Sequence, residues 1–320
     1  MTSFTRNEID TIRGLACFIV VIYHSIHGTL GSVNWGGDIY HQINVYLSYI
    51  RMPLFVFLSG YVYSFRPFEH DHYKFISGKF KRLIIPMLTV GTLYAVVREI
   101  APGTNNSLDK WWLLHIKPVS YFWFVEAIFV IFMIVMVFQT LGFLLNRKRM
   151  EALIVLSIFV SSIGIPIEYF SIDNASYVFP FFMFGLYCGK YKLRFKKMVS
   201  SFLLLMLFGC FSLDYFNIIN MPERKSVIGI VIGMLIPVYI LSLSVTNNTL
   251  SKIGLYSYTI YLFHTFFVSG ARVFFSKIGY FDINVLIITG TLSGIFIPIL
   301  IEELSKPFIS FRKYFLGKRV

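Results

Sequence analysis

The sequence predicts an all-α protein, a polytopic bundle of about ten membrane-spanning helices. Apolar residues make up 56% of the 320 residues and charged residues only 14%, whereas a soluble domain carries roughly 25% charged residues. The apolar residues also gather in runs close to the roughly 20 residues that cross a bilayer. Ten such segments follow one another, at residues 12–30, 43–64, 83–101, 121–145, 152–170, 176–190, 199–217, 226–245, 253–272 and 283–304.

The basic residues predict how these segments are oriented. With the N-terminus inside and the loops assigned alternately, the inside loops and tails carry roughly three times as much Lys and Arg as the outside loops. The inside positions lie mainly in the clusters at residues 79–82, 147–149, 190–197 and 306–319. The outside positions are Arg98, Lys110, Lys117, Arg224, Lys225, Arg272 and Lys277. An even number of spans then places both termini in the cytoplasm, and the net charge of +13 is explained by orientation rather than by nucleic acid binding.

We expect one integral-membrane domain over residues 1–320, with no appended soluble domain. The sequence shows no internal repeat of the kind found in many transporters. Cys17, Cys188 and Cys210 fall inside apolar runs and lack metal-ligand spacing, so we expect neither a disulfide framework nor a metal site.

Residues 9–24 carry the strongest functional signal. Arg13 and His24 are eleven positions apart, which is close to three helical turns, so both side chains lie on one face. His24 would then lie about 16 Å farther along the helix axis than Arg13. Ionisable groups at membrane depth cost several kcal/mol unless they are paired, so this pair indicates a site. His27 shares the face of His24, although it could simply meet water at the helix end.

Two other ionisable residues are expected inside spans. Arg51 falls in the second segment and Glu126 lies about one turn into the fourth. A carboxylate at that depth needs a cation or a proton, and Arg51 and His24 are candidate partners at similar depth. A pair with His24 would fix the tautomer of the imidazole, as a general base requires. The alternative is a structural ion pair between Glu126 and Arg51.

Two patterns leave their alternatives open. Lys79 and Arg82, three residues apart at the start of the third span, could bind lipid head groups or hold the phosphates of a nucleotide-bearing donor. Tyr258, Tyr261 and His264 repeat every three residues in the ninth span, which indicates either a substrate-lining face or a hydrogen-bonded seam between helices.

Four marks together resemble the acyltransferase-3 family of integral-membrane acyltransferases, which O-acetylate bacterial surface glycans and related carbohydrates. In order along the chain they are Ile9-Asp10-x-x-Arg13-Gly14-Leu15-Ala16 with the spacing to His24, Pro53-Leu54-Phe55-Val56-Phe57-Leu58-Ser59-Gly60-Tyr61, the pattern of Lys79, Arg82 and Pro86, and Tyr256-Ser257-Tyr258-Thr259-Ile260-Tyr261-Leu262-Phe263-His264. The resemblance departs from the family pattern at Lys79, where many members have arginine. The hydrolase-like domain that some members append is also not found.

The resemblance implies transfer of an acyl group, acetyl above all, from cytoplasmic acyl-CoA to a hydroxyl of a cell-surface glycan or lipid-linked sugar. It also implies a multi-pass protein of the bacterial cytoplasmic (inner) membrane, with acetyl-CoA as donor substrate and no permanently bound cofactor. Arg13, Lys79 and Arg82 would hold the CoA head, so that the thioester arrives near His24.

His24 would act as general base, or would itself be acylated and pass the group on. Glu126 would orient His24, and Arg51 would stabilise the oxyanion. Two other classes stay open. A proton-coupled transporter or flippase of a glycan or lipid precursor also places histidine, glutamate and arginine inside a bundle. A non-catalytic scaffold or sensor would leave the alignment of Arg13 and His24 unexplained.

Overall fold

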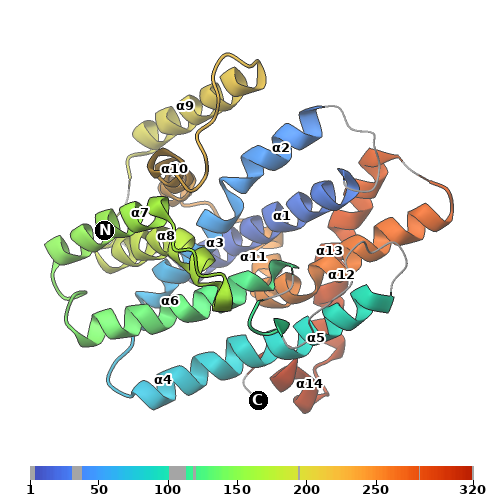
Figure 1. Ribbon diagram of the computed structural model, residues 1–320, viewed down its shortest axis with the longest axis horizontal. Coiled ribbons are helices and arrows are strands. Elements are labelled where there is room, and N and C mark those ends of the chain that lie inside the picture. Colours follow the sequence, from blue (N-terminus) through green and yellow to red (C-terminus); the bar gives the residue numbers. More distant parts are fainter. Residues whose placement is uncertain are drawn as a thin grey trace. The chain divides into compact units, whose positions relative to one another are not determined.

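A computed structural model describes residues 4–30, 38–100, 113–117, 120–193, 195–280 and 282–318 (Figure 1). Within these ranges the chain forms helices and turns, with no strand. The helices are α1 Arg6–Leu30, α2 Asp38–Ser48, α3 Arg51–Tyr63, α4 His72–Lys79, α5 Ile85–Ile100, α6 Trp123–Thr140, α7 Arg147–Ile163, α8 Ile172–Lys190, α9 Lys197–Tyr215, α10 Val227–Leu243, α11 Asn248–Leu255, α12 Ser257–Lys277, α13 Ile283–Leu304 and α14 Ile309–Tyr314. Lys110, Arg194 and Arg319, which contribute to the predicted charge bias, lie outside the described residues.

The predicted all-helical membrane architecture is confirmed in its main feature. Six segments of the described chain are long and apolar enough to cross a membrane: Arg6–Leu30, Ile39–Tyr63, His72–Ile100, Ser120–Thr140, Lys197–Tyr215 and Ile283–Leu304. Each coincides with one of the ten predicted segments. The other four predicted segments are also helical, as α7, α8, α10 and α12. The count of ten spans and the cytoplasmic termini stay predictions.

The contacts divide the chain into two compact units, and each is described by itself. The first unit comprises Met1–Phe65 and Phe184–Leu300, and the second comprises Arg66–Met183 and Ile301–Val320. The prediction of a single membrane domain concerns the whole chain and stays a prediction.

The first unit is organised around α1, which lies against α11 at very short range. A Cβ on Gly14 would come within 1.9 Å of the carbonyl oxygen of Leu250, and one on Gly254 would come within 1.9 Å of the carbonyl oxygen of Asp10. No side chain fits at either position, so the two glycines let the helix backbones touch. Small residues serve the same purpose wherever membrane helices pack closely. Since α12 follows α11 directly, this contact also sets where α12 begins.

The second predicted segment, residues 43–64, is formed by two helices, α2 and α3, and not by one continuous helix. The chain turns at Tyr49 and Ile50, between α2 and α3. Pro53 explains the break, because it has no N–H to continue an incoming helix and is tolerated in a first turn. Arg51 is consequently the first residue of α3, at the turn within the segment Ile39–Tyr63.

In the second unit, a π-helical turn at Phe80–Ile84 joins α4 to α5. Aromatic contacts hold the core of this unit, such as the edge-to-face pair of Phe132 and Phe182, whose ring centroids are 5.4 Å apart. The C-terminal α14 lies against α5, where the Thr89 hydroxyl donates to the carbonyl of Tyr314 at 2.8 Å.

Candidate active site

In the first unit, three helices bring His24, Arg51 and His264 together. His24 lies on α1, Arg51 begins α3, and His264 lies on α12. The Nη1 atom of Arg51 is 3.5 Å from Nε2 of His24. Guanidinium groups only donate hydrogen bonds, so this contact is attractive when Nε2 of His24 carries a lone pair. A neutral His24 with its proton on Nδ1 is therefore the form that the contact favours.

Tyr23 anchors the cation of this cluster. The guanidinium carbon of Arg51 lies 3.3 Å from the centroid of the Tyr23 ring. A contact of this kind is worth about 0.5–2 kcal/mol, depending on how far it is desolvated. The ring of Tyr23 also meets that of His24 edge-to-face at 5.1 Å and stacks on that of His27 at 5.9 Å, with 8° between the ring planes. Tyr23 thus contacts Arg51, His24 and His27, and of the two histidines His27 is the exposed one.

His264 completes the cluster from α12. Its side chain is fully buried, and its ring centroid is 5.0 Å from that of His24. Nδ1 of His264 lies 2.8 Å from the carbonyl oxygen of Tyr261 and 3.0 Å from that of Ile260. Carbonyl oxygens only accept, so Nδ1 carries the proton, and in the neutral ring Nε2 holds the lone pair. Tyr261 is buried beside it, with 6.0 Å between ring centroids, while Tyr258 is partly buried.

Arg13 sits three turns from His24 on the same unbroken helix. It pairs with Asp10 at 3.0 Å, and about a third of its side chain, 34%, is exposed. Asp10 is buried and also meets the exposed Arg6 at 3.7 Å. The guanidinium of Arg13 is therefore held at one end of α1 by a local carboxylate while part of it still faces outward.

Lys79 and Arg82 lie in the second unit, on either side of the start of the π-helical turn. The ammonium group of Lys79 lies 3.3 Å from the centroid of the Phe132 ring on α6, and the side chain is partly buried. Arg82 lies within the turn and is exposed. A π-helix has more residues per turn than an α-helix. The angle between Lys79 and Arg82 therefore differs from the one that regular helical spacing predicts.

Glu126 is buried near the start of α6 in the second unit. The partner that the structure shows is Ser171, whose hydroxyl donates to Oε2 of Glu126 at 3.0 Å. The predicted pairing of Glu126 with His24 or with Arg51 stays a prediction.

Of the predicted site residues, the structure brings together His24, Arg51, His264 and, across Tyr23, His27. Tyr23 is the residue that sequence reasoning missed, because it stands in an apolar run. The signal that could have indicated it is its place in the chain: Tyr23 directly precedes His24, and its hydroxyl is a polar group within an apolar run. The structure shows where all these residues lie, and their chemical roles stay predictions.

A comparison with protein families decides the class of the molecule. The model of an acyltransferase domain, that of the acyltransferase-3 family, matches residues 6–303. The chain belongs to the acyltransferase-3 family. This acyltransferase is thus a membrane protein whose family carries out acyl transfer, and the match includes every predicted site residue. No curated protein and no solved structure matches the sequence. Nothing in these comparisons supports a transporter or flippase.

Proposed function

We propose that this acyltransferase moves an acyl group, preferably acetyl, from cytoplasmic acyl-CoA to a hydroxyl of a cell-surface glycan or lipid-linked sugar. The membrane would be the bacterial cytoplasmic membrane. The contact of Arg51 with Nε2 of His24, beside the buried ring of His264, supports this proposal most directly. It combines a basic nitrogen with a fixed cation at one point, and acyl transfer from a thioester needs both.

His24 is the general base of the proposed reaction. Nη1 of Arg51 first gives up its contact with Nε2 of His24. The acceptor hydroxyl then attacks the thioester carbonyl, a C–O bond forms, and the freed lone pair of Nε2 takes the hydroxyl proton. The tetrahedral intermediate then collapses, the C–S bond breaks, and the thiolate of CoA leaves with the proton that His24 returns. Each turnover gives one ester and one free CoA thiol. General base catalysis of this kind contributes about 10²–10⁴-fold in rate.

Arg51 stabilises the oxyanion that forms in this step. Its place at the first residue of α3 adds the positive end of the helix dipole to the charge of its guanidinium. A cation is unfavourable at that end of a helix, which is consistent with a residue kept for catalysis. Loss of one oxyanion donor typically lowers kcat by about 10²–10³-fold.

The donor is held by Arg13, Lys79 and Arg82 through the phosphates of CoA, and Glu126 orients the imidazole of His24. In the alternative pathway, His24 attacks the thioester itself and becomes acylated. Incubation with labelled acetyl-CoA without acceptor, followed by a rapid quench, separates the two pathways. Label on the protein that His24→Ala removes indicates the acylated intermediate, while its absence supports general base catalysis.

The proposed function is tested with the purified full chain in vesicles, given labelled acetyl-CoA and a lipid-linked oligosaccharide. Covalent label on the oligosaccharide, accompanied by release of CoA thiol, is the expected result. Movement of unmodified oligosaccharide across the vesicle membrane without any labelled product would contradict the proposal.

A further inference from the structure

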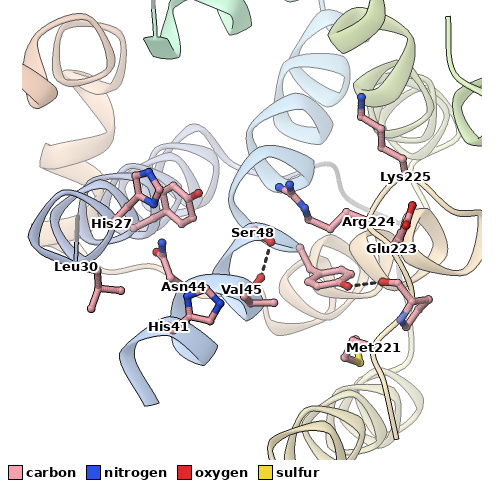
Figure 2. A pocket seen from close by; sticks show the side chains of 13 residues that line it. His27, Leu30, His41, Asn44, Val45, Ser48, Met221, Glu223, Arg224 and Lys225 are labelled. Carbon is pink, nitrogen blue, oxygen red and sulfur yellow. Dashed lines mark hydrogen bonds between the residues drawn. The ribbon is translucent and has the colours of Figure 1, made fainter. Parts of the chain in front are cut away.

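A pocket opens beside the histidine cluster in the first unit (Figure 2). It encloses about 740 Å³ and takes its walls from the end of α1, from α2 and from the chain between α9 and α10. Its lining residues are Tyr23, His27, Leu30, His41, Asn44, Val45, Ser48, Tyr49, Met221, Pro222, Glu223, Arg224 and Lys225. Tyr23 and His27 belong both to this lining and to the cluster around His24. A molecule in the pocket is therefore one side chain away from the proposed base.

Asn44 gives the pocket a hydrogen-bonding group that the protein leaves unused. Its side chain is only 7% exposed, yet Oδ1 has no hydrogen-bond partner among the described residues. A buried polar atom without a partner destabilises the fold, because its bonds to water are lost and not replaced. Such an atom in the wall of a cavity indicates a ligand that donates to it, and a sugar hydroxyl is a donor of the right kind.

The charged groups of the pocket favour an anion. The lining carries two cations, Arg224 and Lys225, and one carboxylate, that of Glu223, and the imidazoles of His27 and His41 add two more donors. Figure 2 shows His41 and Asn44 side by side on α2, with the guanidinium of Arg224 across from them near Ser48. One wall of the pocket, formed by His41 and Asn44, therefore offers hydrogen-bonding groups, and the wall with Arg224 offers a positive charge. A hydroxyl-rich molecule that also carries a carboxylate or phosphate fits both.

Hydrogen bonds hold in place the chain segment that carries Arg224. Asp214 accepts from the Tyr46 hydroxyl at 2.9 Å and from the backbone N–H of Met221 at 2.7 Å. The Tyr49 hydroxyl donates to the carbonyl of Pro222. These bonds fix the segment before Arg224 against α2 and the turn that follows it.

Gly229 on α10 also packs closely against this segment. A Cβ on Gly229 would come within 2.2 Å of the carbonyl oxygen of Glu223 and 2.9 Å of the Cα of Arg224. The first turn of α10 can therefore press directly against the backbone that carries the cation. A preorganised wall binds a ligand without first losing conformational freedom.

We propose that this pocket is the acceptor site and that it selects a saccharide bearing a negative charge. The inference rests on the proposed function, because it takes the pocket's occupant to be the molecule that receives the acyl group. A sugar hydroxyl donates to Oδ1 of Asn44, and the carboxylate or phosphate of the saccharide pairs with Arg224. The ring of Tyr23, at the inner end, is where the reacting hydroxyl passes toward His24.

The test is a binding measurement on the full chain in a polyoxyethylene detergent, which has no sugar headgroup. The probes are a disaccharide containing glucuronic acid, a disaccharide phosphate and the matching neutral disaccharide. The wild-type protein should bind at least one acidic probe about tenfold or more tightly than the neutral one. The carboxylate and phosphate probes show which anion the site prefers.

Two variants and a control make the test specific to this pocket. Arg224→Gln should abolish the preference for the acidic probe, and Asn44→Leu should weaken binding of all probes about three- to tenfold. Lys277→Gln, a change of an exposed cation outside the pocket lining, should leave every affinity unchanged. Equal binding of acidic and neutral probes, or a preference that survives Arg224→Gln, would overturn the proposal.

Transfer measured in parallel separates this inference from the proposed function. Acidic-probe binding that depends on Arg224, without any transfer of label, supports the pocket and contradicts the acyltransferase reaction on that saccharide. Transfer of label that neither Arg224→Gln nor Asn44→Leu affects supports the reaction and overturns the pocket as acceptor site.

Discussion

The Nη1 atom of Arg51 lies 3.5 Å from Nε2 of His24 and so joins α3 to α1 at the centre of the candidate site. Arg51 also covers the ring of Tyr23, the neighbour of His24. The same guanidinium therefore positions the imidazole and supplies a positive charge beside it. This double role gives Arg51 two measurable functions that different substitutions can separate.

Arg51→Lys should keep the positive charge and lose the planar contacts with Tyr23 and His24. We expect this variant to retain a small part of the activity, whereas Arg51→Ala should lower kcat by about 10²–10³-fold, as the loss of an oxyanion donor does. Steady-state kinetics with labelled acetyl-CoA measures both. Equal activity of Arg51→Ala and the wild type would refute a role in catalysis.

Lys79 and Arg82 should act on donor binding rather than on the chemical step. Replacing either with Gln should weaken acetyl-CoA binding about 10- to 150-fold, because a hydrogen bond to a charged group contributes about 1.5–3 kcal/mol. Equilibrium binding of labelled acetyl-CoA gives the affinity. The control is Lys81→Gln, an exposed cation in the same π-helical turn. If Lys81→Gln weakens binding as much as the other two, the effect is one of general charge and not of these positions.

Gly14→Ala and Gly254→Ala should destabilise the first unit. Each added methyl group meets a backbone carbonyl oxygen at 1.9 Å, so α1 and α11 must move apart. Overpacking of this kind typically costs about 1–3 kcal/mol. Thermal unfolding in detergent measures the change. Gly209→Ala is the matched control, since nothing lies within 4 Å of its added Cβ, and its transition should stay at the wild-type temperature or rise slightly.

Glu126→Gln tests whether this carboxylate orients the base. The variant can still accept the hydrogen bond from Ser171, so the local fold should persist. If Glu126 positions His24, kcat should fall while KM for the donor stays the same, and the pH dependence of kcat should change. A drop in the unfolding temperature with unchanged kcat would instead indicate a purely structural carboxylate.

Sequence periodicity alone was sufficient for the relationship of Arg13 and His24. Both lie on the unbroken helix α1, because the apolar run between them contains no proline. The four sequence motifs of the family could also be recognised from the sequence, because each is a short run of neighbouring residues. The match over residues 6–303 confirms the family. These signals depend only on neighbours in the chain.

Contacts between distant segments could not be predicted in the same way. His264 meets His24 across 240 positions, and no local pattern in the sequence encodes that pairing. The π-helical turn Phe80–Ile84, which begins between Lys79 and Arg82, is only five residues long and so has no recognisable sequence period. Regular helical spacing therefore does not predict the angle between these two side chains. Asn44 and Arg224 meet at one cavity only because α2 and the segment before α10 fold together.

The most direct test of the central claim is the single-turnover rate of acetyl transfer by His24→Ala, with acetyl-CoA binding measured on the same sample. His70→Ala, which changes an exposed histidine outside the cluster, is the control and should behave as the wild type does. We predict that His24→Ala binds acetyl-CoA normally and transfers acetyl at least about 100-fold more slowly. Added imidazole should restore part of the rate. Transfer by His24→Ala at the wild-type rate would contradict the assignment of His24 as the base.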